Sequence, residues 1–197
     1  MFDESGVDYG VLTAIGLAIA SAMVLVFIFS LLKSSETSDS VVALESACAE
    51  VCGDIETVNS MAIPYKAERY YELDGVDVYV SSGYINASGG KATFSRPFAG
   101  RIIPGNYSAN GTRLWNGTVG MREYLGATFN ATGTRERPID HSSAGGLEDL
   151  MRGASMSTLA VPVEVPHGRP LIVEKAFIYT TDGSVMEAEP YVLVYSG

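Results

Sequence analysis

The stretch VVALESACAEVCGDIETVNSMA, residues 41–62, has a helical period from which the rest of the fold can be worked out. Its apolar side chains recur at alternating steps of three and four residues, the spacing of one helix face. They are Val41, Leu44, Cys48, Val51, Ile55, Val58 and Ala62. Pro64 follows, and proline cannot continue a helix because it lacks a backbone N–H. The stretch therefore predicts an amphipathic helix that ends near residue 62.

Two cysteines lie one turn apart on this predicted helix. The helical rise alone places the Cα atoms of Cys48 and Cys52 about 6 Å apart, which is within bridging distance. A straight helix directs the two side chains unfavourably for the bond, although Gly53 allows the turn to distort. Two interpretations stay open: a disulfide, or two buried thiols on the packing face.

A longer apolar run precedes the amphipathic stretch. Residues 10–32 read GVLTAIGLAIASAMVLVFIFSLL and carry no charge. A helix of this length reaches ~35 Å, enough to cross the hydrocarbon of a bilayer. The leader MFDESGVDY is acidic, so a cleaved secretory signal fits poorly. We expect one long helix over residues 8–62, apolar at its start and amphipathic at its end.

Small residues are frequent in the first half of the apolar run, and they let helices approach closely where apolar surface alone cannot drive packing. The positions expected to pack in a helical assembly are Gly10, Ala14, Gly16, Ala18, Ala20, Ala22, Val24, Phe27 and Leu31. Ordinary membrane composition is the alternative reading of the same residues.

The period changes from 3.6 to 2 after residue 65. Runs rich in Val, Tyr, Thr and Ile at 76–80, 91–95, 122–128, 159–165, 170–181 and 184–196 predict strands. Asp182-Gly183 between the last two runs predicts a hairpin, and residues 147–151 predict a helical turn. Many short strands with turn signals favour a sandwich or a barrel. The predicted fold class is α+β: the long N-terminal helix (residues 1–62), then an all-β, immunoglobulin-like sandwich head (residues 63–197).

The composition disfavours several function classes. The 197 residues carry 13 Lys and Arg against 23 Asp and Glu, a net charge of −10. Nucleic acid binding needs a basic footprint, so we expect no nucleic acid partner. Only two cysteines and two histidines are present, which leaves little for a metal site or a histidine-driven active site. We expect no metal, no cofactor and no catalytic residues, and read His141 and His167 as loop residues.

Glycosylation is the most specific local signal. The chain has six asparagines, and five of them begin an Asn-X-Ser/Thr sequon. The five are Asn86, Asn106, Asn110, Asn116 and Asn130. A sequon of this kind is an acceptor in surface loops of exported proteins. The body is therefore predicted to be extracellular and to carry covalent N-glycans.

The charge pattern around the apolar run conflicts with export. Lys33 is the only base near the run and lies on its C-terminal side, which by the positive-inside tendency places the body in the cytoplasm. The sequons predict the opposite side. Either a basic leader once preceded Met1 and was removed, or the run is an anchor with weak charge signals.

An apolar and then amphipathic N-terminal segment joined to a sequon-rich, strand-rich body resembles the type IV pilin superfamily, in particular its archaeal adhesion pilins and archaellins. The resemblance implies a subunit that waits in the cytoplasmic membrane and then polymerises into a cell-surface filament, with an adhesion target on a surface or another cell. It also implies a basic leader removed by a peptidase. Two features depart from the family: the nearest acids to mature position 5 are Glu4 and Asp8, and nine residues precede the apolar run.

Three further functions stay open on the sequence alone. The chain fits an archaellin of a swimming filament less well than an adhesion pilin, because archaellins begin their apolar segment almost at once. It also fits a single-pass, membrane-anchored surface glycoprotein that acts as a binding module. An anchored extracellular enzyme is the least favoured of these functions.

Overall fold

The computed structural model describes residues 21, 23–25, 28, 41–90 and 92–197. The chain divides into two compact units, residues 1–42 and residues 43–197. We call residues 43–197 the head. Most of the predicted amphipathic helix therefore belongs to the head.

The helix over residues 41–60 buries one face in the head, as its period predicts. The buried side chains are Leu44, Ala47, Cys48, Val51, Cys52, Ile55 and Val58. Val41 is 38% exposed, and Ala62 is exposed beyond the end of the helix. The helix ends four residues before Pro64, and the Nζ atom of Lys175 donates hydrogen bonds to the carbonyls of Asn59 and Met61 just at and after this end.

The described part of the head contains three sheets. The first has the order β1-β10-β11-β5, with β8 pairing to β10; its strands are Tyr65–Arg69, Leu171–Thr181, Met186–Ser196, Ile102–Pro104 and Ile139–Asp140 (β8). The second has the order β4-β3-β2-β9, over Ala92–Pro97, Tyr84–Gly89, Asp77–Val80 and Val163–Glu164. The third is the hairpin of β6 (Asn106–Ala109) and β7 (Thr112–Asn116). The helical elements of the rest of the head are α2 (Gly117–Phe129), the short 3-10 helix His141–Ser143 and α3 (Ala144–Ala160).

The hairpin of β10 and β11 is the centre of the head. Its strands pair from Leu171↔Ser196 to Thr181↔Met186, which confirms the predicted hairpin at Asp182-Gly183. The Asp182 carboxylate accepts hydrogen bonds from the backbone N–H groups of Ser184 and Val185 at 2.8 and 2.7 Å. On its other edge β11 pairs with β5 over residues 192–194, and none of the described strands pairs with residues 186–190 on that side.

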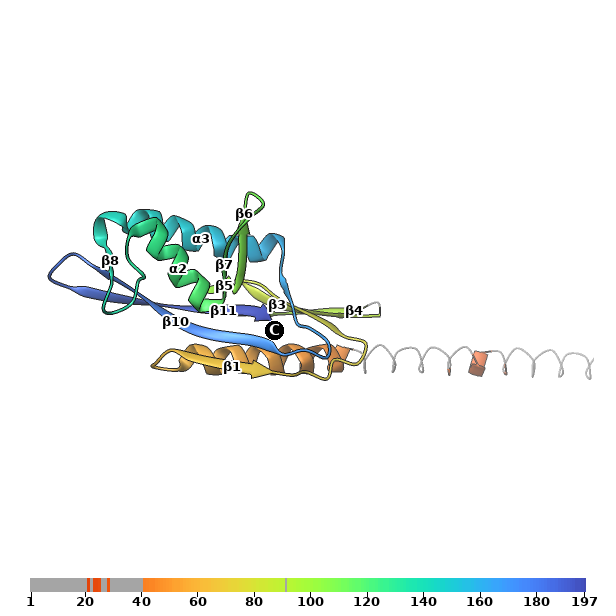
Figure 1. Ribbon diagram of the computed structural model, residues 1–197. Coiled ribbons are helices and arrows are strands. Elements are labelled where there is room, and N and C mark those ends of the chain that lie inside the picture. Colours follow the sequence, from red (N-terminus) through yellow and green to blue (C-terminus); the bar gives the residue numbers. More distant parts are fainter. Residues whose placement is uncertain (1–20, 22, 26–27, 29–40, 91) are drawn as a thin grey trace, which may run out of the picture. The chain divides into compact units, whose positions relative to one another are not determined.

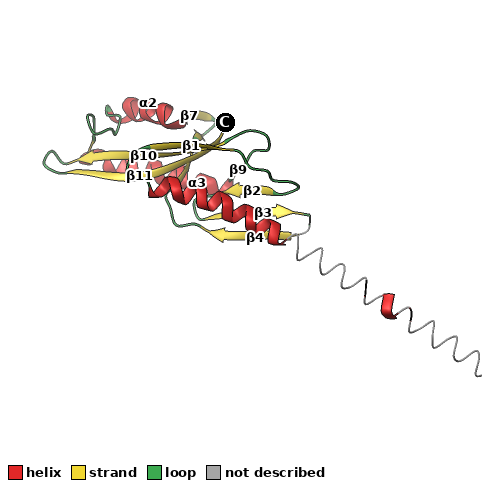
Figure 2. Ribbon diagram, turned by 90° about the horizontal axis from the view of Figure 1, so that it is seen from below, coloured by secondary structure: helices red, strands yellow, loops and turns green. Residues whose placement is uncertain are grey.

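Alternate residues of this hairpin supply two cores, because successive side chains of a strand point to opposite faces. Leu171, Val173, Val192 and Val194 pack with the helix over residues 41–60 and the second sheet. Ala176, Ile178, Tyr191 and Leu193 pack with α2 and α3. The helices accordingly lie on opposite sides of β10 and β11 (Figure 1; seen from below in Figure 2).

The predicted fold class is wrong. The head is a mixed α/β structure with several sheets, and the run 122–128 expected as a strand lies inside α2. α3 extends well beyond the single turn expected at 147–151. Both helices contain several Gly, Ser and Thr residues, whose low helix propensity reads as loop or strand. Packing on the β10–β11 hairpin stabilises them instead, as tertiary contacts do for most helices.

The expected long N-terminal apolar helix is also not found among the described residues. Helical positions before residue 41 are limited there to 21, 23–25 and 28. Within the described part of the chain, no helix has the length and apolar character needed to cross a membrane. Of the single helix expected over residues 8–62, the described residues include helical positions 21, 23–25 and 28 and the helix over residues 41–60; the rest of the expected helix before residue 41 lies outside the described residues.

Candidate functional site

The hairpin of β6 and β7 carries three of the five sequons. Its two-residue turn is Asn110-Gly111, with φ angles of 52° and 76°. Positive φ at both central positions is the signature of a type I′ turn, for which Asn-Gly is the preferred pair. The sequence contains this hairpin signal, which the glycosylation reading of the same residues obscured.

One face of this hairpin is anchored to the head. The Trp115 ring lies 4.6 Å from the Tyr107 ring and 5.9 Å from the Tyr124 ring of α2. The indole Nε1 donates a 3.0 Å hydrogen bond to the carbonyl of Pro104, so the buried polar group of the side chain is satisfied. Because side chains alternate along a strand, Asn106 and Asn116 project from the opposite, exposed face.

The five sequons differ in their surroundings. Four asparagines are exposed: Asn106, Asn110, Asn116 and Asn130. Asn116 is the N-cap of α2, and Asn130 is its C-cap in the left-handed conformation. Asn86 is half-buried in β3, a strand flanked by β2 and β4, and its side-chain oxygen accepts a hydrogen bond from Ser95.

A carboxylate from the central strand holds the start of α2. Glu174 of β10 accepts hydrogen bonds from both the backbone N–H and the hydroxyl of Thr118. A carboxylate at a helix N-terminus is favoured by the unpaired N–H groups there. Burial, and then the charge of Glu174, raise the pKa of Tyr195 beside this contact.

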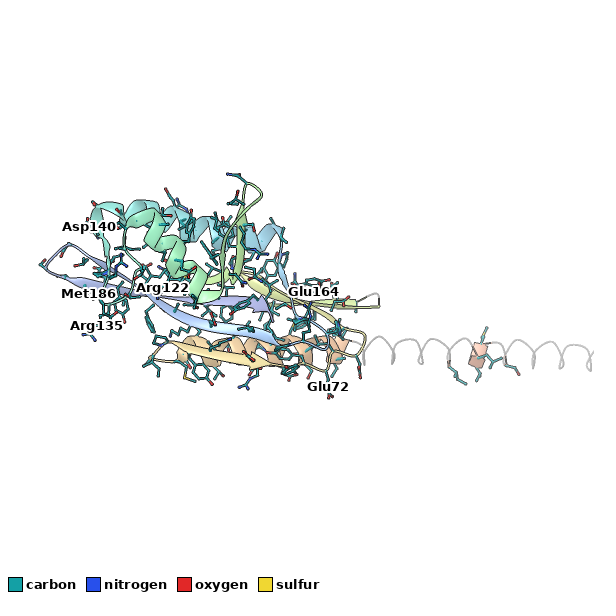
Figure 3. All side chains as sticks on the ribbon, viewed as in Figure 1. Glu72, Arg122, Arg135, Asp140, Glu164 and Met186 are labelled. Carbon is teal, nitrogen blue, oxygen red and sulfur yellow. The ribbon has the colours of Figure 1, made fainter. Side chains whose placement is uncertain are left out.

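Arg122 holds the other part of α2 (Figure 3). Its guanidinium donates to the carbonyls of Thr132 and Gly133 at 3.0 and 2.7 Å and to the carbonyl of Phe177 in β10 at 2.5 Å. Desolvation lowers the pKa of Arg122 from its ordinary value. The side chain thus links α2, the loop that follows it and the central strand.

The two cysteines are free thiols in the structure and are fully buried. The Cys48 Sγ atom lies 3.6 Å from the carbonyl oxygen of Ile85, and the Cys52 Sγ atom lies 3.4 Å from a carboxylate oxygen of Glu56. Burial raises the pKa of both thiols, so both stay protonated at neutral pH.

A cleft of about 440 Å³ lies between α3 and the strands β5, β10 and β11. Its apolar lining comes from Ile103, Leu147, Met151 and Met156. Its polar lining comes from Arg101, His141, Glu148, Arg152, Glu187 and Glu189. This volume and this mixture of surfaces are typical of small-ligand sites.

Three polar side chains on the wall of the cleft form a hydrogen-bonded cluster. Glu189 accepts hydrogen bonds from Arg101 at 2.6 Å and from the Tyr191 hydroxyl at 2.8 Å. Burial, and then the bond to Glu189, raise the pKa of Tyr191 to about 12. Within the described part of the chain no ion pair involves Glu148 or Glu187, so the cleft offers two unpaired carboxylates to a ligand.

Sequence reasoning missed the cleft. Its residues come from three strands, from α3 and from the 3-10 helix, where His141, interpreted from sequence as a loop residue, lies on its wall. No local motif connects these positions. In the described residues no group of three or more His, Cys, Asp or Glu side chains is arranged to hold a metal ion.

The predicted packing residues of the apolar run fall largely outside the described residues. Val24 is described; it is helical and 57% exposed. Those outside are Gly10, Ala14, Gly16, Ala18, Ala20, Ala22, Phe27 and Leu31.

Comparison with known proteins assigns the chain to no group. No family model matches the sequence, and no solved structure matches the chain.

Proposed function

We propose that the chain is a structural subunit of an extracellular, type IV pilus-like filament, with a glycosylated head and a role in adhesion. The proposal rests on one observation: the helix over residues 41–60 buries its apolar face inside the head. Its seven buried side chains all lie within the head, so that face is already occupied. The uncharged run at residues 10–32 is then the part of the chain left to join subunits.

Residues 10–32 can serve both before assembly, as a membrane anchor, and after assembly, as the core of the filament. In the bilayer the run is surrounded by lipid; in the filament it is surrounded by the same run of neighbouring subunits. At roughly 25 cal/mol per Å² of apolar surface, this uncharged and mainly apolar run of 23 residues resists transfer to water by tens of kcal/mol. The small residues at its start permit close approach of neighbours. The four exposed sequon asparagines support a head that faces the extracellular medium.

Electron microscopy of material sheared from producing cells tests the proposal, with mass spectrometry to identify the subunit. We expect uniform filaments built from this chain. Gly16→Leu should reduce filament yield while trypsin resistance of the head stays unchanged, and Gly16→Ala serves as the matched control. A chain that remains a detergent-soluble monomer in the membrane fraction contradicts the proposal.

An archaellin of a swimming filament is the variant of this proposal that the sequence also permits. Deletion of the gene distinguishes the two. Loss of attachment with normal swimming supports the adhesion pilus, and loss of swimming supports the archaellin.

The cleft favours a second candidate, an anchored surface glycoprotein that binds a small ligand. Its 440 Å³ and its unpaired Glu148 and Glu187 suit a ligand with amine or hydroxyl groups. Under this candidate Glu187→Gln reduces cell attachment, and the exposed Arg96→Gln, on β4 and outside the cleft, does not. Equal attachment by both variants contradicts it.

A further inference from the structure

We propose that the folded head leaves two of its five sequons open to an N-glycosyltransferase, those of Asn106 and Asn110, and closes the other three by hydrogen bonds of the fold itself. This inference rests on the proposed glycosylated, extracellular head. It follows from the two groups that a sequon must present, the asparagine amide and the hydroxyl two residues later.

The reaction sets the geometric requirement. The amide Nδ2 of asparagine attacks C1 of a sugar on a lipid-phosphate-linked oligosaccharide. An N–C1 bond forms, the bond from C1 to the phosphate oxygen breaks, the lipid phosphate leaves, and the amide proton passes to a base of the transferase. Because the motif requires Ser or Thr at its third position, the enzyme must also reach that hydroxyl.

Asn106 and Asn110 meet both requirements on the β6–β7 hairpin. Both asparagines are exposed, and so are the hydroxyl residues of their sequons, Ser108 and Thr112. At the turn, a Cβ added to Gly111 would meet nothing within 4 Å, so there is open space at the residue next to Asn110.

The sequon of Asn116 does not offer a free hydroxyl to the enzyme. Thr118 gives both its backbone N–H and its hydroxyl to the same carboxylate oxygen of Glu174, whose side chain is only 14% exposed. Glu174 therefore closes this sequon from the central strand, and opening it requires loss of the contact that starts α2.

A second feature acts against Asn116 once its neighbour is modified. Asn106 and Asn116 are directly paired across the hairpin, and the adjacent Gly117 N–H bonds the Gly105 carbonyl at 2.7 Å. This pattern makes Asn106 and Asn116 a non-hydrogen-bonded pair, with Cα atoms about 4.5 Å apart and side chains on one face. A glycan on Asn106 then covers the amide of Asn116.

The remaining two sequons are closed in other ways. Asn86 is half-buried within β3, and its side chain is engaged by Ser95. Asn130 is exposed, but Thr132 of its sequon is half-buried and its hydroxyl pairs with that of Thr134 at 3.2 Å.

The test compares the folded chain with its own peptides. Full-length protein made without glycan, in detergent micelles, is incubated with an oligosaccharyltransferase and a lipid-phosphate-linked oligosaccharide. Its tryptic peptides receive the same treatment, and mass spectrometry gives the occupancy of each sequon. We expect the ratio of folded to peptide occupancy to be near one at Asn106 and Asn110. At Asn116 it should be lower by about tenfold or more, the factor that a hydrogen bond to a charged group provides. At Asn86 and Asn130, where the bonds join neutral groups, it should be lower by about two- to tenfold.

Glu174→Ala tests the cause at Asn116. Made together with Asn106→Gln, so that no glycan on Asn106 covers the Asn116 amide, it should raise the ratio at Asn116 above that of Asn106→Gln alone. Glu68→Ala in the same background, which removes an exposed carboxylate of β1 paired with Lys66, should leave the ratio unchanged. Equal ratios at all five sequons in the unmutated protein overturn the inference, whether or not the variant folds. If protein from producing cells carries no glycan at any of the five asparagines, the glycosylated head in the proposed function is contradicted. The present inference is tested separately, by the occupancy ratios measured in vitro.

Discussion

The helix over residues 41–60 and the helices α2 and α3 pack on the same central hairpin, but they are held there in different ways. The first buries an unbroken stripe of seven apolar side chains, from Leu44 to Val58. α2 buries Gly117, Met121 and Leu125, and depends on Glu174 and Arg122 for its remaining contacts with the sheet. An apolar stripe is visible in a sequence; a polar contact between distant residues is not.

The largest effect is expected when an apolar contact is removed from the stripe. Ile55 is fully buried in the first core. Ile55→Ala should lower the free energy of unfolding by roughly 2–5 kcal/mol, the cost of lost transfer energy and a cavity. Urea unfolding of the full-length protein in detergent, followed by Trp115 fluorescence, measures it. Val41→Ala, at an exposed position of the same helix, is the control; a similar loss in both would show that the stripe does not hold the helix.

The polar attachment of α2 is tested by Arg122→Met, which keeps the apolar stem and removes the guanidinium. Three carbonyls lose the Arg122 donor, although that of Gly133 also accepts from the Tyr179 N–H, so we expect the free energy of unfolding to fall by about 2–4 kcal/mol. Arg122→Lys should recover only part of this, because an ammonium cannot reproduce the planar fork. The exposed Arg137→Met is the control. A change of about 0.5 kcal/mol or less at Arg122 would mean that α2 is held by apolar contacts alone.

The helix over residues 41–60 also has a polar contact with the sheet, which Lys175→Met removes. Lys175 is 7% exposed and donates to the carbonyls of Asn59 and Met61. Because methionine leaves these carbonyls without their donor, we expect a loss of about 1–3 kcal/mol. Lys66→Met, at an exposed lysine of β1, should change stability little. Hydrogen exchange at residues 56–61 should rise in Lys175→Met alone, and equal exchange in both variants would contradict the capping role.

The smallest effect is expected at the cleft, where the Tyr191 hydroxyl donates a hydrogen bond to Glu189. Tyr191→Phe removes one hydrogen bond and should cost about 0.5–1.5 kcal/mol at neutral pH. The folded pKa of about 12 lies above the unfolded value of about 10. This contribution is therefore complete below pH 10 and is lost as the pH rises towards 12. Stability measured from pH 9 to 12 should fall less steeply in Tyr191→Phe than in the control Tyr70→Phe; parallel curves would contradict the assignment.

Much of the first core could be predicted from the sequence. The steps of three and four residues identified the buried face of the helix, and Asp182-Gly183 identified the central hairpin. Several strands also lie where runs of β-branched and aromatic residues predict them. These successes share a cause: each depends on residues close together in sequence.

The second core could not be predicted in the same way. α2 contains Arg122 and Thr128 within a run that reads as a strand, and its helical state depends on Glu174 and Phe177, some 50 residues away. The cleft is assembled from β5, α3, β10 and β11 and has no motif. The sequons were visible as acceptors, but the contacts that separate Asn110 from Asn116 arise only in the folded head.

The unpaired edge of β11 has a consequence for a chain proposed to polymerise. An exposed strand edge is a template on which another chain can add its own strand, and such growth competes with ordered assembly and leads to aggregates. Residues 186–190 present Glu187, Glu189 and Pro190 on this segment. Glu187, which makes no ion pair among the described residues, repels a second copy of the same segment, and Pro190 offers no N–H to an incoming strand. The head is thereby protected from uncontrolled association at the concentrations that a filament demands.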